Sequence, residues 1–168
     1  MHEMVIYGVS FDLVGKQPIV LLKTTEGNKF LPIWIGHPEA AAILMKLQGA
    51  TTPRPMTHDL VTDILGQLDA HVVRITVTEL RESTFYAQIT VQQDGSEVEI
   101  DSRPSDAIAL AIRAEAPIFV ADRVIEESAI EFEGEEVNEE EIVSEFKRFL
   151  DHVSPDEFAV EDEEEREG

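Results

Sequence analysis

Residues 72–100 read VVRITVTELRESTFYAQITVQQDGSEVEI, and this stretch decides the fold. Apolar and polar side chains alternate over residues 72–80 and again over 84–91, which predicts two half-buried strands. Asp94-Gly95 follows the second strand and is the strongest signal for a tight hairpin turn in the chain. Residues 96–100 are therefore predicted to pair back as a third antiparallel strand.

A helix and a short strand are predicted directly after this hairpin. Pro104 is placed to open a helix with the sequence SDAIALAIRAE, because proline is favoured at the first helical position. Ala116-Pro117 ends that helix, and residues 118–121 are a further strand candidate. Residues 122–128 then predict a small helix.

Three more strands are predicted upstream, over residues 3–11, 18–23 and 29–35, where they form a meander. Pro32 lies within the third strand and has no backbone N–H to donate to a neighbouring strand. This position therefore indicates either a strand at the edge of the sheet or a bulge.

Two helices are predicted between the two groups of strands. The first begins near Pro38 and ends at Gly49, and its AAAILMKLQ segment is apolar over most of its circumference, which predicts a buried helix. The second begins at Thr57, whose hydroxyl can cap it. Its apolar residues recur at helical spacing, which favours an amphipathic helix: Leu60, Val61, Ile64, Leu65 and Leu68.

Together these elements predict an α+β fold, a single compact domain with a mainly antiparallel mixed sheet and three to four packed helices. The chain has 168 residues, and its 43% apolar content is enough for one hydrophobic core. We assign the domain to residues 1–130 and an acidic C-terminal extension to 131–168. One amphipathic stretch at 137–151 either docks as a helix on the domain or binds a separate partner, and the end of the chain is expected to be disordered.

The net charge of −22 is concentrated in the last quarter of the chain. Residues 1–124 hold 10 Lys or Arg against 16 Asp or Glu, whereas residues 125–168 hold 3 against 19. An acidic protein repels phosphate backbones, so the composition argues against tight, salt-driven capture of nucleic acid. Transient contact, for example through a divalent cation, stays open.

The sequence also indicates a cytoplasmic protein. It contains no cysteine, which excludes a disulfide framework, a thiolate metal site and a cysteine nucleophile. The segment MHEMVIYGVS at the start has no signal-peptide pattern, and no apolar run approaches the length of a membrane-spanning helix. We therefore expect no membrane association.

Three polar clusters stand at the starts of predicted helices, where free backbone N–H groups attract anions. They are His37 with Glu39, then His58 with Asp59, and finally Asp101, Arg103, Ser105 and Asp106. The chain has no phosphate-cradling glycine loop, no His-Glu-x-x-His pair and no G-x-S-x-G turn. These clusters are therefore the places where chemistry could be located.

The third cluster is the richest and has two interpretations. In the functional one, Asp101 and Asp106 share a hard divalent ion and Arg103 binds a phosphate through two hydrogen bonds. In the structural one, Asp106 caps free N–H groups in the first turn of the helix and Arg103 pairs with Asp101.

The two histidine clusters are equally ambiguous. His58 can act as a general base or proton carrier, with Asp59 or Glu39 completing a metal site. Alternatively, His58 is a solvated residue of the first helical turn and Asp59 only complements the helix dipole. His37 and Glu39 have the same two interpretations, whereas Trp34, within a predicted strand, indicates a core or interface residue.

Several blocks of the sequence, in this order, resemble the bifunctional nuclease family. They are LPIWIG with the EAAAI helix, RPMTHDL, TFYAQI and DSRPSDAIALAIRAEAPIFVA, and the resemblance spans residues 3 to about 128. It implies a compact α+β domain with nuclease activity on both RNA and DNA and little base preference. It also implies a shared cleft at the matching polar positions: Glu39, Arg54, His58, Asp59, Asp101, Arg103, Ser105 and Asp106.

The leading hypothesis is therefore hydrolysis of phosphodiester bonds in single-stranded or unstructured nucleic acid. Glu39, Asp59, Asp101 and Asp106 would hold Mg²⁺ or Mn²⁺, which activates water. Arg54, Arg103 and Ser105 would bind the phosphate, and His58 would assist proton transfer.

Two other hypotheses stay open. One is a non-catalytic interaction or regulatory domain, homodimeric, whose acidic extension binds a basic partner. The other is a sensor of small anions or nucleotides at the helix starts.

Overall fold

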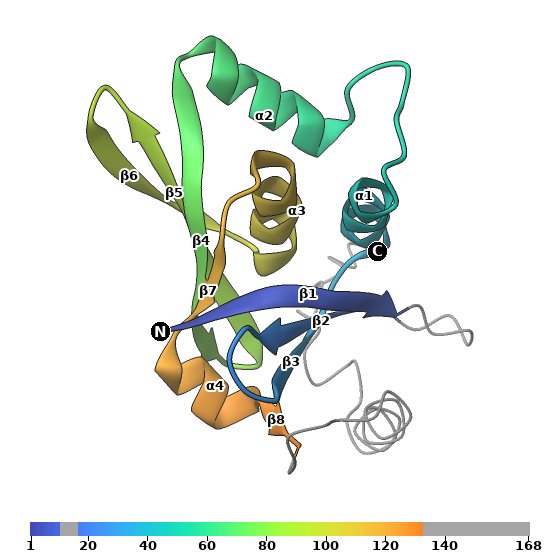
Figure 1. The fold of residues 1–168 in the computed structure, drawn as a ribbon, viewed down its shortest axis with the longest axis vertical. Helices are drawn as coiled ribbons and strands as arrows, with labels where there is room; N and C mark the ends of the chain where they lie inside the picture. The colour runs from blue at the N-terminus through green and yellow to red at the C-terminus, as the bar shows by residue number, and fades with distance from the viewer. Residues whose placement is uncertain (11–16, 133–168) are drawn as a thin grey trace, which may run out of the picture.

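The computed structural model describes residues 1–10 and 17–132. Figure 1 shows the arrangement of its strands and helices. In chain order these are β1 (His2–Ser10), β2 (Ile19–Thr24), β3 (Lys29–Trp34), α1 (His37–Leu47), α2 (Thr57–Gln67), β4 (Ala70–Arg81), β5 (Thr84–Gln93), β6 (Ser96–Ser102), α3 (Pro104–Ala114), β7 (Ile118–Val120), α4 (Asp122–Ser128) and β8 (Ile130–Glu131).

The strands form one mixed sheet in the order β6-β5-β4-β7-β1-β2-β3-β8. All neighbouring pairs are antiparallel except β4 and β7, which run parallel. The sheet is strongly twisted, so that β1 runs nearly horizontally in Figure 1 while β4 runs nearly vertically. The α+β fold predicted from the sequence is confirmed, as are its mainly antiparallel mixed sheet and its helices.

The hairpin at residues 94 and 95 is confirmed in detail. Gln93 pairs with Ser96 across the turn. Asp94 and Gly95 both have a positive φ, at 50° and 77°, as a two-residue type I′ turn requires. The turn before it, between β4 and β5, uses Glu82 and Ser83, which also have positive φ and which no sequence signal indicated.

Pro32 pairs with Leu21 of β2 on one side. On the other side β8 reaches only Lys29 and Phe30, so among the described residues no strand pairs with β3 at the proline, as expected for an edge position.

Helices α1 and α2 both pack against α3, and α3 also lies on β4 and β5. Figure 1 shows these three helices together, with α4 at the other end of the molecule. Five residues of α3 from Ala107 to Ala111 are buried in succession, so this helix is the centre of the helical layer.

Two expectations about the helices need correction. Helix α1 is not buried all round, because Ala40 and Ile43 are buried while Leu47 is 48% exposed. Helix α2 packs Val61 and Leu65 against the core. Its other apolar residues form an exposed stripe: Leu60, Ile64 and Leu68, with Met56 just before the helix. The helical spacing was therefore predicted correctly, but the apolar residues occupy two faces.

The acidic extension at 131–168, with its amphipathic stretch at 137–151 and its disordered end, lies almost entirely outside the described residues, so these predictions stay predictions. Among the residues that the structure does describe, no helix combines the length and apolar character that a membrane span needs.

Candidate functional site

Arg103 and Asp106 start helix α3 and lie side by side. Arg103 is the residue just before the helix, and Pro104 follows it at the first helical position. The Arg103 Nε donates a hydrogen bond of 2.9 Å to Oδ2 of Asp106, one helical turn away. Arg103 does not form the ion pair with Asp101 that the structural interpretation of the sequence predicted. Arg103 thus pairs within its own helix start rather than with β6.

Glu39 brings helix α1 into the same cluster. The Nη2 of Arg103 donates to Oε1 of Glu39 at 2.6 Å, across 64 positions of sequence. Gly36 precedes α1, and the Glu39 carboxylate folds back so closely over it that a Cβ at Gly36 would collide with Oε2. The glycine therefore gives Glu39 room to reach Arg103.

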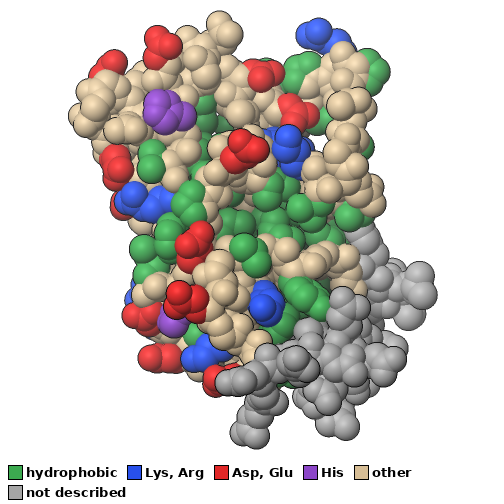
Figure 2. Space-filling model, in the orientation of Figure 1, with side chains coloured by type: hydrophobic (Ala, Val, Ile, Leu, Met, Phe, Trp, Pro, Cys, Tyr) green, Lys and Arg blue, Asp and Glu red, His purple; other side chains and the backbone are tan. Residues whose placement is uncertain are grey.

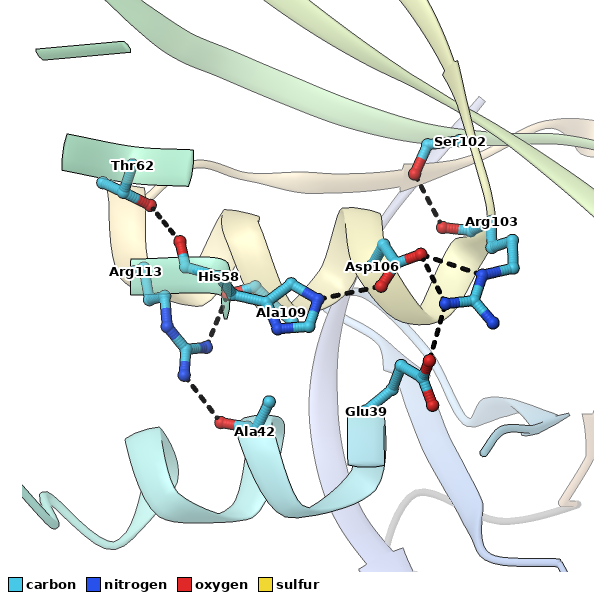
Figure 3. Close-up of polar contacts among 9 residues, drawn as sticks. All are labelled: Glu39, Ala42, His58, Thr62, Ser102, Arg103, Asp106, Ala109 and Arg113. Carbon is cyan, nitrogen blue, oxygen red and sulfur yellow. Dashed lines mark hydrogen bonds and ion pairs between the residues drawn. The ribbon is translucent and has the colours of Figure 1, made fainter. Parts of the chain in front are cut away.

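His58 joins the cluster from helix α2. Its Nε2 lies 2.8 Å from Oδ1 of Asp106, and its side chain is 11% exposed. Figure 3 shows the continuous row of contacts from Glu39 through Arg103 and Asp106 to His58, drawn from three helices. We call these four residues the Arg103 network.

The Arg103 network is accessible at its arginine. The Arg103 side chain is 65% exposed, although it is bound to two carboxylates, while Glu39 is 12% exposed. The hydrogen bond to Glu39 raises the pKa of the Arg103 guanidinium above its ordinary value, with a smaller contribution from Asp106 and against the opposing effect of burial. A permanently charged guanidinium at the surface beside a buried histidine is an arrangement that can bind a phosphate and move a proton.

A second arginine ties the same three helices together at the other end of α3. The Nε of Arg113 donates to Oδ1 of Asp59 at 2.7 Å. Its other nitrogens donate to the backbone carbonyls of Ala42, at 3.0 Å, and Ala109, at 2.9 Å. Figure 3 shows Arg113 with Ala42 and Ala109. The Arg113 side chain is only 7% exposed, so its contacts are internal.

Asp59 is bound by protein groups through both of its carboxylate oxygens. Its Oδ2 also accepts the backbone N–H of Met56, so both carboxylate oxygens are engaged. The hydrogen bond from Arg113 lowers the pKa of the Asp59 carboxyl below its ordinary value, with burial opposing the change. Asp59 caps α2 and anchors it to α3.

Asp101, Ser105 and Arg54 make no hydrogen bond or ion pair with the Arg103 network in the part of the chain that the structure describes. Asp101 is exposed on β6, where it pairs with Gln88 of β5. Ser105 is buried in the first turn of α3. Arg54 is exposed on the connection between α1 and α2, and His37 is exposed at the start of α1.

The four carboxylates proposed to hold a divalent ion do not fit a common site. Glu39 and Asp106 have the guanidinium of Arg103 between them, Asp59 is bound to Arg113, and Asp101 lies on the sheet. Across residues 1–10 and 17–132, no three His, Asp or Glu side chains are grouped closely enough to hold a metal ion.

Arg113 was missed as a candidate, although the sequence carries a signal for it. It is the single charged residue within the apolar segment AIALAIRA of α3. A charged residue on a helix that is otherwise apolar has to find a partner when it is buried, so its position predicts an ion pair with a neighbouring element. Only the structure identifies that partner as Asp59.

Charges on the visible face of the molecule are mixed. Figure 2 shows acidic and basic side chains scattered beside one another, with no continuous basic stripe. The described part of this face therefore offers no long basic track for a nucleic-acid backbone.

The protein is thus a compact α+β domain whose three packed helices present histidine, carboxylate and arginine side chains together. The sequence profile of the bifunctional nuclease domain matches residues 20–133. The chain belongs to this family, as the sequence blocks had indicated.

The similar proteins fall into two groups. An uncharacterized protein of Mycobacterium tuberculosis is 37% identical over 164 residues, which cover 94% of this chain and 98% of that protein. Bifunctional nuclease 1 of Oryza sativa subsp. japonica is 28% identical over 109 residues, or 62% of this chain and 33% of the rice protein. Bifunctional nuclease 1 of Arabidopsis thaliana is 27% identical over 107 residues, or 61% and 33%. The chain thus spans about a third of the length of these plant relatives.

Proposed function

We propose that the protein is a nuclease that hydrolyses phosphodiester bonds of single-stranded or unstructured RNA and DNA at the Arg103 network. Membership of the bifunctional nuclease domain family and similarity to the plant bifunctional nucleases support the reaction class. The observation that carries the location is the contact of an exposed, permanently charged Arg103 with the same carboxylate that holds His58.

Each residue of the Arg103 network has a role in this proposal. Arg103 binds the phosphate and stabilises the negative charge that develops on it. Asp106 accepts the proton of His58 Nε2, which fixes the ring and leaves Nδ1 as the acceptor that a general base needs. Glu39 holds Arg103 in place from α1.

Turnover of single-stranded DNA and RNA oligonucleotides by purified protein tests the proposal. We expect His58→Asn to lower kcat by about 10²–10⁴-fold, the usual contribution of a general base. Asp106→Asn should lower it as well, because the ring loses its ionised acceptor. Arg123→Gln removes an exposed ion pair with Glu79, far from the network in sequence and on α4, and is the matched control.

The same assay includes an arm with EDTA and an arm with added Mg²⁺ or Mn²⁺. Loss of activity with EDTA would support the metal prediction made from the sequence, whereas activity that survives EDTA would support metal-independent chemistry at His58. Equal activity of wild type, His58→Asn and Asp106→Asn would contradict the assignment of the site.

A second candidate function, a homodimeric interaction domain, is favoured by one observation. The exposed stripe Leu60, Ile64 and Leu68 on α2 repeats every four residues, so it forms one apolar face of the helix. A second copy of this chain is the occupant we propose. Light scattering of wild type and of Leu60→Glu/Ile64→Glu tests this: a dimer that becomes a monomer supports it, and a monomeric wild type contradicts it.

A further inference from the structure

A cavity of about 300 Å³ lies beside the Arg103 network, and neither the family nor the sequence assigned it a role. Its walls come from four segments: the last part of α1, the connection to α2, the first turn of α2 and the last turn of α3. The lining residues are Met45 and Lys46, then Ala50, Thr51, Thr52 and Pro55, and finally Asp59 and Arg113.

Two charged residues of the lining, Arg113 and Asp59, are held rigidly. They bind one another, and each is fixed by further hydrogen bonds to backbone atoms: Arg113 to two carbonyls and Asp59 to the N–H of Met56. In the connection between α1 and α2, the Thr52 hydroxyl donates a hydrogen bond of 2.6 Å to the carbonyl of Arg54, which fixes this part of the lining. A ligand therefore meets groups that are already in place.

The charge of the cavity differs from that of the whole chain. Asp59 and Arg113 neutralise one another, which leaves Lys46 as the remaining charged side chain of the lining. Lys46 is exposed, and its charge acts on the nearby Asp59 carboxylate, which is bound directly to Arg113. In a chain with a net charge of −22, a pocket with a surplus positive charge favours an anionic ligand.

The rest of the lining is suited to a ring and a sugar. Met45, Ala50 and Pro55 supply apolar surface, while the Thr51 hydroxyl can donate or accept a hydrogen bond and the Thr52 hydroxyl, which donates to Arg54, can still accept one. Such groups hold a planar base without distinguishing strongly between bases. A ligand with an apolar ring, hydroxyl groups and a phosphate matches all three parts of the lining.

A single strand of nucleic acid bound at the Arg103 network would also reach the cavity. Asp106 contacts His58, and Arg113 lies seven residues further along α3, a rise of about 10 Å. That separation equals about three stacked nucleotides at roughly 3.4 Å each. His58 and Asp59 are neighbours on α2, with His58 at the network and Asp59 at the cavity.

We infer that this cavity is a nucleotide-binding pocket, which holds one nucleotide of the substrate strand with its phosphate at Lys46, a few nucleotides from the bond that is cut. The position on a substrate strand rests on the proposed function, whereas the binding of a nucleotide does not.

Steady-state kinetics with two substrates tests the inference. For a single-stranded oligonucleotide, Lys46→Gln should raise KM about tenfold, since it removes a charged contact to phosphate, and should leave kcat within about twofold. For bis(p-nitrophenyl) phosphate, which is too short to reach the pocket from Arg103, the same variant should behave as wild type. Lys29→Gln on β3 is the matched control and should change neither substrate.

A binding experiment separates this inference from the proposed function. Titration of AMP and UMP into wild type, Lys46→Gln and Ala50→Phe, followed by calorimetry, measures the pocket without turnover. We expect about tenfold weaker binding for Lys46→Gln, and a loss of binding for Ala50→Phe, whose ring fills the cavity. Near-ultraviolet circular dichroism of each variant checks that it is folded.

The outcomes are distinct. If nucleotides bind through Lys46 but neither the wild type nor any variant hydrolyses a diester, the nucleotide-binding pocket is supported and the nuclease proposal is contradicted. If hydrolysis depends on His58 while Lys46→Gln and Ala50→Phe leave both KM and nucleotide binding unchanged, the inference is overturned and the nuclease proposal stands.

Discussion

Helix α3 carries an arginine at each end, and the two side chains make similar contacts in opposite environments. Each one joins α3 to both α1 and α2, either directly or through a carboxylate that it binds. Arg113 is 7% exposed and Arg103 is 65% exposed. A buried ion pair contributes to stability only while it is complete, whereas an exposed one contributes little and leaves its charge available to a ligand. We therefore expect Arg113 to contribute mainly to the stability of the fold and Arg103 mainly to activity.

The largest effect is expected when the buried arginine is removed. Arg113→Ala breaks hydrogen bonds to Asp59, Ala42 and Ala109 and leaves a space among three helices, so we expect a loss of about 3 kcal/mol in the free energy of unfolding. Urea denaturation measures this change. Arg123→Ala is the control, and its loss should stay below about 1 kcal/mol because its ion pair is exposed. Equal losses for both variants would contradict the comparison.

The exposed arginine should give the opposite pattern. Arg103→Ala is expected to lower kcat on oligonucleotides about 10²-fold, as the loss of one charge-stabilising group does. Its free energy of unfolding should change by less than about 1 kcal/mol. Arg103→Lys separates charge from geometry, since lysine keeps the charge but cannot bind two oxygens in a plane. A variant that unfolds more easily but hydrolyses as wild type would reverse the assignment of the two arginines.

A smaller effect is expected at Gly36. The Gly36 backbone has φ −73° and ψ 156°, which alanine adopts easily, but its Cβ would collide with the Glu39 carboxylate. Gly36→Ala should therefore displace Glu39 from Arg103 and lower kcat several-fold, with a change in stability of about 1 kcal/mol or less. Gly66→Ala is the matched control because a Cβ there meets nothing within 4 Å, and it should be neutral or slightly stabilising. Unchanged turnover of Gly36→Ala would show that Glu39 does not matter to the site.

The smallest effect concerns pH. The pKa of Asp59 is lowered in the folded protein by Arg113, so the ionised carboxylate stabilises the fold above the unfolded value of about 4, and this contribution is lost as the pH falls below it. Asp59 is 37% exposed, so solvent screens the pair and we expect about 1 kcal/mol or less. Denaturation of wild type and Asp59→Asn at pH 6 and pH 3 measures it. The difference between the two proteins should shrink at pH 3, and a constant difference would contradict the role of this pair.

The strands, turns and helix starts could largely be predicted from the sequence, because patterns over a few residues determine them. The alternation in residues 72–91, the Asp94-Gly95 turn and Pro104 at the start of α3 each act over a few residues, and the structure confirms all of them. The two apolar faces of α2 could not be assigned, since helical spacing shows that a residue lies on a face but not which face meets the core. The strand β8 has only two residues, too few to leave a pattern.

The candidate site was predictable only in part for the same reason. Residue types at the helix starts indicated Glu39, His58, Arg103 and Asp106, and the structure brings these together. Asp101 is close to Asp106 in sequence but on the sheet in space, because the chain changes from β6 to α3 between them. The choice of Arg113 as the partner of Asp59 spans 54 positions, and no local pattern encodes a contact at that distance.

The three-residue strand β7 connects the two halves of the sheet. Among the described residues it pairs with β4 on one side and with the N-terminal strand β1 on the other, where His2 to Met4 meet Ile118 to Val120. During synthesis β2 can pair with one side of the first strand early, but the side at His2 to Met4 stays open until more than a hundred further residues have been made, on the order of ten seconds at ~5–20 residues per second. This open strand edge is a site at which newly made chains can pair with one another, so their aggregation should respond to substitutions in β7 more than its length suggests.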